Sequence, residues 1–171
     1  MSTQNTTPGS LHLRELIGSA VISRLSGAIL GNVADIVIEP YENKVYALLI
    51  KTYSIIPLSR IILFHNITDF TKGRVIVKSE NSVYSLSSYK FPENAVLYRP
   101  EANNKPIYKN TFDTNVPRTP LGILKNARCD AETGYIQEFI FSKQKYNLPW
   151  TRNEKIAVNK FRTVDNTIII E

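Results

Sequence analysis

Few residues of this chain have the type and spacing that catalysis or metal binding requires. His12 and His65 are the two histidines, and they lie far apart, outside any ligand cluster of the kind that zinc or iron needs. Cys129 is the single cysteine, and in the internal repeat described below it aligns with Ile38, which favours an apolar filler over a nucleophile. GxxxxGK[ST], GxGxxG and GxSxG sequences are absent. We therefore expect no catalytic residue, metal or cofactor, and an enzyme is the weaker hypothesis.

Composition indicates a globular protein with a modest excess of positive charge. The 171 residues are 43% hydrophobic, which is enough to bury a core in one domain or in two small ones. The net charge of +6 comes from Lys and Arg interspersed with Asp and Glu, as on an ordinary soluble surface. Nucleic-acid binding is therefore possible but not favoured.

Location signals favour the cytoplasm. The first residues, MSTQNTTPGS, lack a cationic start and an apolar run, so we expect a solvated tail rather than a signal peptide. No apolar stretch reaches the length of about 18 residues that a membrane-spanning helix needs, so peripheral membrane association would require a partner. A single cysteine cannot form an internal disulfide, which fits a reducing compartment.

Hydrophobic alternation predicts β-strands along most of the chain. Val33–Glu39 mixes apolar and acidic residues before Pro40, and YEN supplies a turn before the apolar run Lys44–Ile50, so the two runs predict a hairpin. Further strands are expected at SAVIS, RVIVK and NTIIIE. Helical periodicity is scarce: PLSRIILFHN could form one turn after Pro57, and Ser82–Tyr89 is ambiguous.

The segment SGAILGNVADIVIEPYENKVYALLI, residues 26–50, has a divergent copy in TPLGILKNARCDAETGYIQEFIF, residues 119–141. A shift of 91 positions superposes Gly31 on Gly122 and carries the alignment across the hairpin without a gap. Beyond the hairpin, IPLSR and LPWTR match with a shift of 92, and each copy ends on a β-branched run, RVIV or TIII. This ordered set of features favours duplication over a coincidence of β patterning.

The first copy combines spaced glycines, acidic residues in a strand and turn, and a strand rich in Val, Ala and Leu. The residues concerned are Gly27, Leu30-Gly31, Asp35, Glu39 and Val45-Tyr46-Ala47-Leu48. This pattern resembles the start of a PRC-barrel domain, the small β-barrel found in the reaction-centre H subunit cytoplasmic domain and in the C-terminal domain of the ribosome maturation factor RimM. The likeness extends from Leu16 to about Lys78 and is thinner in the second half, where Asn126-Ala127-Arg128 replaces the apolar strand.

The resemblance implies an all-β fold of two tandem small PRC-barrel-like β-barrels. We expect a disordered tail at residues 1–11, a first unit at 12–82, a connector at 83–103 and a more divergent second unit at 104–171. The resemblance also implies that the protein binds a protein partner, including docking to a photosynthetic or other large complex.

Two features are candidates for contact with that partner. The connector is rich in aromatic residues, and Tyr89, Phe91 and Tyr98 either pack it against the barrels or form a docking surface. The sequence P-x-[ST]-R occurs twice, ending at Arg60 and at Arg152. Each arginine either stabilises its own barrel or reaches a carboxylate of the partner.

Three classes of function stay open at this stage. The first is a non-catalytic adaptor or assembly factor, and the second is an RNA-processing or ribosome-maturation factor related to RimM. The third is an enzyme. The adaptor is favoured over the RimM-like role because the N-terminal half resembles a second PRC-barrel rather than the different barrel that precedes this domain in RimM.

Overall fold

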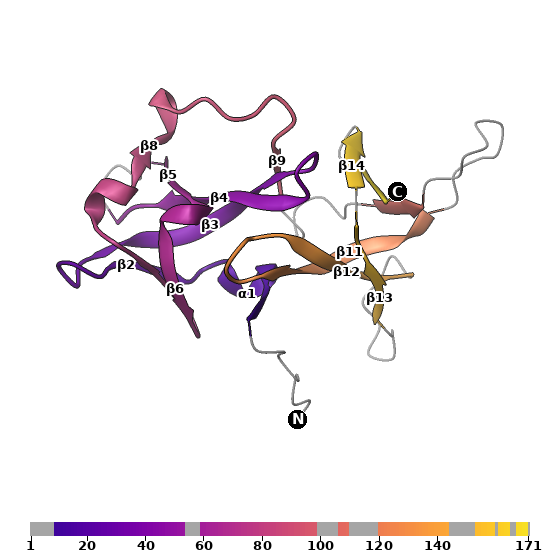
Figure 1. Ribbon diagram of the computed structural model, residues 1–171, viewed down its shortest axis with the longest axis horizontal. Coiled ribbons are helices and arrows are strands. Elements are labelled where there is room, and N and C mark those ends of the chain that lie inside the picture. The colour runs from indigo at the N-terminus through magenta and orange to yellow at the C-terminus, as the bar shows by residue number, and fades with distance from the viewer. Residues whose placement is uncertain are drawn as a thin grey trace.

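The computed structural model describes residues 9–53, 59–98, 106–109, 120–143, 153–159, 161–164 and 167–170 of the chain. Within these ranges the protein is all-β, which confirms the predicted fold class. The helical elements are short: α1 (Leu13–Leu16), η1 (Phe64–Asn66), η2 (Glu80–Ser82) and η3 (Leu86–Ser88). The strands form two sheets, each built mainly from one half of the chain (Figure 1).

The first sheet comes from the N-terminal half. Its strands are β2 (Ala20–Ser23), β3 (Ile29–Glu39), β4 (Lys44–Lys51), β5 (Ser59–Leu63), β6 (Ile67–Thr71), β7 (Arg74–Val77) and β8 (Tyr84–Ser85). They lie in the order β6-β7-β2-β3-β4-β5-β8, with β2 and β7 parallel and the other neighbours antiparallel.

The second sheet repeats this arrangement. Its strands are β10 (Pro106–Lys109), β11 (Pro120–Asp130), β12 (Ile136–Ser142), β13 (Asn153–Ala157), β14 (Phe161–Val164) and β15 (Thr167–Ile170). The order β14-β15-β10-β11-β12-β13 matches β6-β7-β2-β3-β4-β5 strand for strand, and β10 and β15 are again the parallel pair. The predicted duplication is therefore present in the topology.

The register of the central hairpin agrees as well. Val33 lies opposite Ile50 in the first sheet, and Leu124 lies opposite Phe141 in the second, which are the same positions shifted by 91. A β-bulge follows each pair. Because register and bulge coincide, the hairpin alignment derived from sequence is confirmed.

Gly31 and Gly122 occupy the same bend in the two units. Their φ angles are +148° and +159°, and a Cβ atom on either would lie 2.4 Å from a carbonyl oxygen, that of Lys51 or of Ser142. No residue with a side chain fits so close an approach of two backbones. Glycine at this position is thus required by the curvature of both hairpins.

Each unit is preceded by a short arm that pairs with the other unit. β1 (Ser10–His12) joins β11, with Leu11 opposite Cys129, and β9 (Val96–Leu97) joins β3, with Val96 opposite Ile38. Ile38 and Cys129 are equivalent under the shift of 91, so the two arms are exchanged symmetrically. Figure 1 shows α1, which follows β1 directly, beside β11 and β12, and β9 beside β3.

One hydrophobic core runs through both units. Its buried members come from both halves, among them Val21 and Leu48 of the first sheet and Phe139 and Ile168 of the second. The hairpin ends also touch, because Lys44 and Tyr135 form an antiparallel bridge. The two units therefore form one packed body rather than beads on a flexible connector.

Two local expectations are corrected by the structure. The tail predicted for residues 1–11 is wrong for Ser10 and Leu11, which belong to β1, while residues 1–8 lie outside the described residues. The helical turn expected in PLSRIILFHN begins later, because Ser59–Leu63 forms β5 and the turn, η1, follows it. A strand as short as β1, paired with the other half of the chain, leaves no periodic pattern in the sequence.

Candidate interaction surface

Arg60 lies on β5 opposite Ser85 of β8, in a hollow of the surface. The hollow has a volume of about 370 Å³ and is lined by Arg60, Leu86 and three serines, Ser59, Ser85 and Ser87. The Arg60 side chain is partly exposed, and its guanidinium forms no hydrogen bond or ion pair with a described residue. A guanidinium held among hydroxyl groups can bind a carboxylate or phosphate in a bidentate manner.

An aromatic cluster includes Tyr84, the residue that precedes Ser85 of the hollow in the sequence. Tyr89 is its centre, with ring centroids 6.3 Å from Tyr46, 6.1 Å from Tyr84 and 5.6 Å from Phe91. The hydroxyl groups of Tyr46 and Tyr89 are hydrogen-bonded at 2.5 Å. The cluster joins β4, β8 and the connector, so it fixes the connector on the first sheet.

The environment of Tyr89 disfavours its ionised form. Desolvation, followed by the hydrogen bond with Tyr46, raises the pKa of Tyr89 to about 12. The phenol therefore stays neutral at physiological pH and acts as a hydrogen-bonding and packing group. Neither role is that of a general base.

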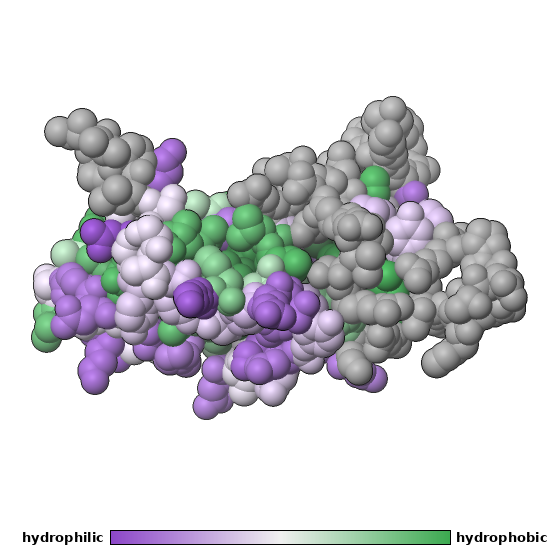
Figure 2. Space-filling model, turned by 90° about the horizontal axis from the view of Figure 1, so that it is seen from above, coloured by the Kyte–Doolittle hydropathy of each residue, from purple (hydrophilic) through white to green (hydrophobic). Residues whose placement is uncertain are grey.

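The connector covers the outer face of the first sheet. Val37, Ala47 and Ile61 are buried there beneath partly buried hydrophobic residues of β4, β5 and the connector. These covering residues are Tyr46, Leu49, Leu63, Tyr89, Phe91, Ala95 and Leu97. Figure 2 shows hydrophobic side chains gathered on the face seen from above, bordered by hydrophilic ones. Tyr89 and Phe91 thus pack the connector against the sheet, while Tyr84 remains 39% exposed.

Tyr98 does not belong to a docking surface, and this part of the prediction is corrected by the structure. Its side chain is 1% exposed and lies in the core shared by the two units. Its backbone N–H donates to the carbonyl oxygen of Ile36 in the first unit at 2.8 Å, and its hydroxyl donates to Asn126 of the second at 3.3 Å. Tyr98 therefore joins the units.

The strand register does not support Arg60 and Arg152 as equivalent residues of the two units. Arg60 lies opposite Ile50, and the equivalent of Ile50, Phe141, lies opposite Glu154. Glu154 therefore occupies the place of Arg60 in the second sheet, where it forms an ion pair with Lys143 at 2.7 Å. Arg152 lies outside the described residues. The Arg60 hollow is a feature of the first unit.

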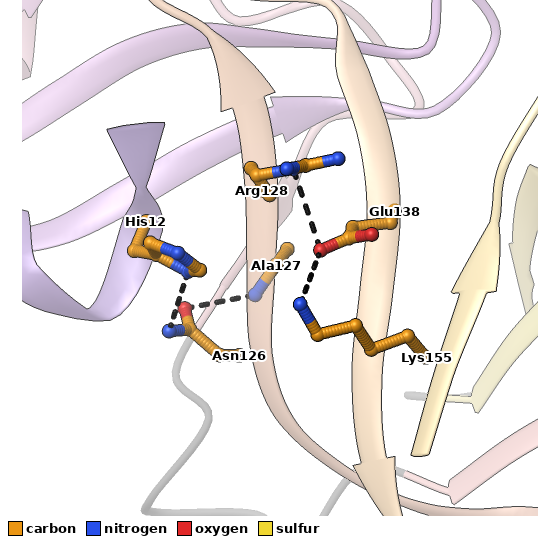
Figure 3. A network of polar contacts seen from close by, with 6 residues as sticks. All are labelled: His12, Asn126, Ala127, Arg128, Glu138 and Lys155. Atoms are coloured by element: carbon orange, nitrogen blue, oxygen red, sulfur yellow. Dashed lines mark hydrogen bonds and ion pairs between the residues drawn. The ribbon is translucent and has the colours of Figure 1, made fainter. Parts of the chain in front are cut away.

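Sequence reasoning missed Asn126, which is the polar centre of the junction. Its side-chain oxygen accepts the backbone N–H groups of Arg14, at 3.0 Å, and Ala127, at 2.9 Å, as well as the Tyr98 hydroxyl. Its amide nitrogen lies 3.3 Å from Nδ1 of His12 (Figure 3). Asn126 thereby ties the exchanged arm and the connector to β11.

The signal that could have found Asn126 is its place in the repeat. It is the equivalent of Asp35 under the shift of 91, and both side chains accept the N–H of the following residue just after the bulge. A polar residue at the same position in two apolar strands indicates a conserved local geometry within the chain. Its partners across the junction come from distant segments, so the sequence does not show them.

Figure 3 also shows a charged network on the second sheet. Glu138 of β12 lies 3.3 Å from Nε of Arg128 and 3.4 Å from Nζ of Lys155, and its side chain is 13% exposed. The three charges link β11, β12 and β13 side by side. Their mutual pairing indicates a structural role, since each charge of the network already has an opposite charge within reach.

Reactive chemistry finds little support among the described residues. They contain no group of three or more His, Cys, Asp or Glu that could hold a metal ion. Cys129 is fully buried, and desolvation raises the pKa of its thiol to about 12, which suppresses the nucleophilic thiolate. In the part of the chain that the structure describes, no helix has the length and apolar character to cross a membrane.

The fold defines an all-β protein of two similar units, and the first unit carries the Arg60 hollow and the aromatic cluster. Residues 8–83 match the family model of the PRC-barrel domain. The chain therefore carries a PRC-barrel domain in its first half, which confirms the resemblance seen in the sequence. The second unit lies outside this match, and its kinship with the first rests on strand order and register. No curated protein matches the chain.

Proposed function

We propose that the protein is a non-catalytic adaptor or assembly factor that binds a protein partner. The PRC-barrel domain at residues 8–83 supports this proposal, because such domains are in general protein-interaction modules. The observation that carries the proposal is the Arg60 hollow: a guanidinium without an ion pair among the described residues, in a hollow lined by Leu86 and three serines. Arginine is among the residues enriched at interface hot spots.

The partner that fits this surface offers an acidic group to Arg60 and an apolar group to Leu86. Leu86 is partly buried and lines the same hollow as Arg60. Docking to a photosynthetic or other large complex in the cytoplasm is the form of this function that the family resemblance favours. In this form of the function, the second unit stabilises the first through their shared hydrophobic core.

The test is affinity purification of the tagged protein from its own cells, with bound proteins quantified by mass spectrometry. Arg60→Ala should reduce recovery of the specific partner about tenfold or more, the loss expected for a hot-spot arginine. Arg24→Ala removes the same charge from an exposed position and is the matched control. Equal recovery with both variants would contradict the proposal.

Thermal unfolding separates this role from a structural one. Because the Arg60 guanidinium has no ion pair within the described part of the chain, Arg60→Ala should leave the melting temperature close to that of the wild type. A clear loss of stability would instead assign Arg60 to its own barrel. Co-purification of RNA whose amount falls steeply with salt would favour the alternative of an RNA-processing or ribosome-maturation factor.

A further inference from the structure

A groove lies where the first unit, its exchanged arm and the second unit meet. Its volume is about 410 Å³, and it is lined by residues 9–11, by Ile67–Phe70 of β6, and by Ala131 and Glu132 at the end of the β11–β12 hairpin. In Figure 1 the end of that hairpin lies beside β6. We call this site the junction groove. β1, which pairs with the second unit, supplies two of its lining residues, Ser10 and Leu11.

The apolar lining of the junction groove is continuous with the protein core. Leu11, Ile67 and Phe70 are partly buried hydrophobic residues that pack against the core and keep some exposed surface. The Phe70 ring is held against Phe64, with centroids 5.6 Å apart. A partner's apolar side chain placed on this lining would be removed from water without a rearrangement of the protein.

One wall of the groove is the edge of a sheet. β6 is the terminal strand of the first sheet, and among the described strands it pairs with β7 alone. An unpaired strand edge offers backbone groups to an added strand of another protein. The bulge between Ile67 and Asp69 interrupts the regular edge, so pairing would extend over a short segment.

The charge of the groove is acidic, against a net charge of +6 for the chain. Asp69 and Glu132 are exposed, and the described residues of the lining include no Lys, Arg or His. The Asp69 carboxylate accepts the N–H of Phe70 at 2.8 Å, which holds it at the strand edge. Neither carboxylate forms an ion pair with a described residue. This charge is complementary to a cation and repels an acidic segment.

We propose that the junction groove binds an extended, basic segment of a partner protein. Backbone pairing with β6 orients the segment, one apolar side chain lies on Leu11 and Phe70, and one Lys or Arg side chain reaches Asp69 and Glu132. Residues 1–8, which precede the groove residues in the sequence, contain no Lys or Arg side chain that could serve as this cation. The site is separate from the Arg60 hollow, which lies at β5 and β8.

The probe is a fluorescein-labelled peptide of alternating lysine and valine, and its binding to the full-length protein is measured by fluorescence anisotropy. This peptide should bind, whereas a labelled peptide of alternating glutamate and valine should not. Asp69→Asn combined with Glu132→Gln should weaken binding about tenfold or more. Asp69→Asn keeps a side-chain oxygen for the Phe70 N–H, so the variant removes the charge without removing that hydrogen bond.

Glu93→Gln is the control, because it removes one exposed carboxylate from the connector, outside the groove lining. It should leave the affinity unchanged. Hydrogen exchange should slow in Ile67–Thr71 when the lysine and valine peptide binds. Absence of binding, an equal effect of Glu93→Gln, or unchanged exchange in β6 would each overturn the proposal. None of these results depends on Arg60, so the two proposals fail separately.

Discussion

Val45 and Ile136, which are equivalent positions of the two units, each donate a backbone N–H to the turn of the opposite unit. Val45 donates to the carbonyl oxygen of Gly134 and Ile136 to that of Asn43, both at 2.9 Å. Asn43 and Gly134 are themselves equivalent, and both have a positive φ, +53° and +77°. The two hydrogen bonds are therefore related by a pseudo-two-fold axis.

This symmetry extends from the hairpin ends to the exchanged arms. β1 lies on β11 and β9 lies on β3, so each unit completes the sheet of the other. Equivalent surfaces of the two units contact each other, as the subunits of an isologous dimer do, but here both units belong to one chain. The protein is therefore a covalent internal dimer, and the junction groove lies where its two units meet.

The glycines of the two bends give the first prediction. Gly31→Ala and Gly122→Ala should each lower the free energy of unfolding by about 3 kcal/mol, because the added Cβ would meet a carbonyl oxygen at 2.4 Å and the φ angle is strained. Urea unfolding measures the loss. Gly27→Ala is the control, since its φ is +73° but nothing lies within 4 Å, and it should lose about 1 kcal/mol. Equal losses at Gly27 and Gly31 would refute the close approach.

Asn126 gives the second prediction. Asn126→Leu should destabilise the protein by about 2 kcal/mol or more, because it leaves the N–H groups of Arg14 and Ala127 and the Tyr98 hydroxyl without their acceptor. Asn126→Asp keeps an oxygen acceptor and should lose much less. Urea unfolding of both variants provides the comparison, and similar losses for Leu and Asp would show that the acceptor does not matter.

The third prediction concerns pH. The pKa of Tyr89 is raised from 10.0 to about 12, so the folded protein holds this proton more tightly than the unfolded chain. The resulting stability is fully present below pH 10 and is lost as the pH rises through about 12. The difference in unfolding free energy between wild type and Tyr89→Phe should therefore shrink from pH 8 to pH 11. Tyr98 and Cys129 are present in both the wild type and Tyr89→Phe, so their titration cancels in the difference between the two unfolding free energies. A difference that stays constant between pH 8 and pH 11 would contradict the assignment to Tyr89.

Much of the sheet topology could be predicted because its signals are local. Alternating apolar residues, the turn before Lys44 and the glycine at each bend lie within single hairpins, so the shift of 91 aligned β3 and β4 with β11 and β12 correctly. The sequence does not distinguish the buried Tyr98 from an exposed residue, because an aromatic residue in a connector has the same local pattern in both cases.

The arms and the exact place of Arg60 needed the structure. β1 and β9 contain three and two residues, too few for a periodic pattern, and their partners lie in the other unit. The shared P-x-[ST]-R motif pairs Arg60 with Arg152, but the strand pairing places Glu154 at the position equivalent to Arg60. The loop between the second hairpin strand and the next therefore differs in length between the units.

The arm exchange, on which the internal dimer and the junction groove both depend, can be tested by one disulfide measurement. Leu11 lies directly opposite Cys129, and directly opposed antiparallel residues have Cα atoms about 4.5–5.5 Å apart, within disulfide range. Leu11→Cys and Val96→Cys are compared after equilibration in a glutathione redox buffer, with linked peptides identified by mass spectrometry.

With the arms exchanged, Leu11→Cys should form an intramolecular disulfide with Cys129 and Val96→Cys should not, because Val96 lies opposite Ile38. If each arm instead stayed with its own unit, Val96 would take the place opposite Cys129. A disulfide in Val96→Cys, together with free thiols in Leu11→Cys, would contradict the exchange.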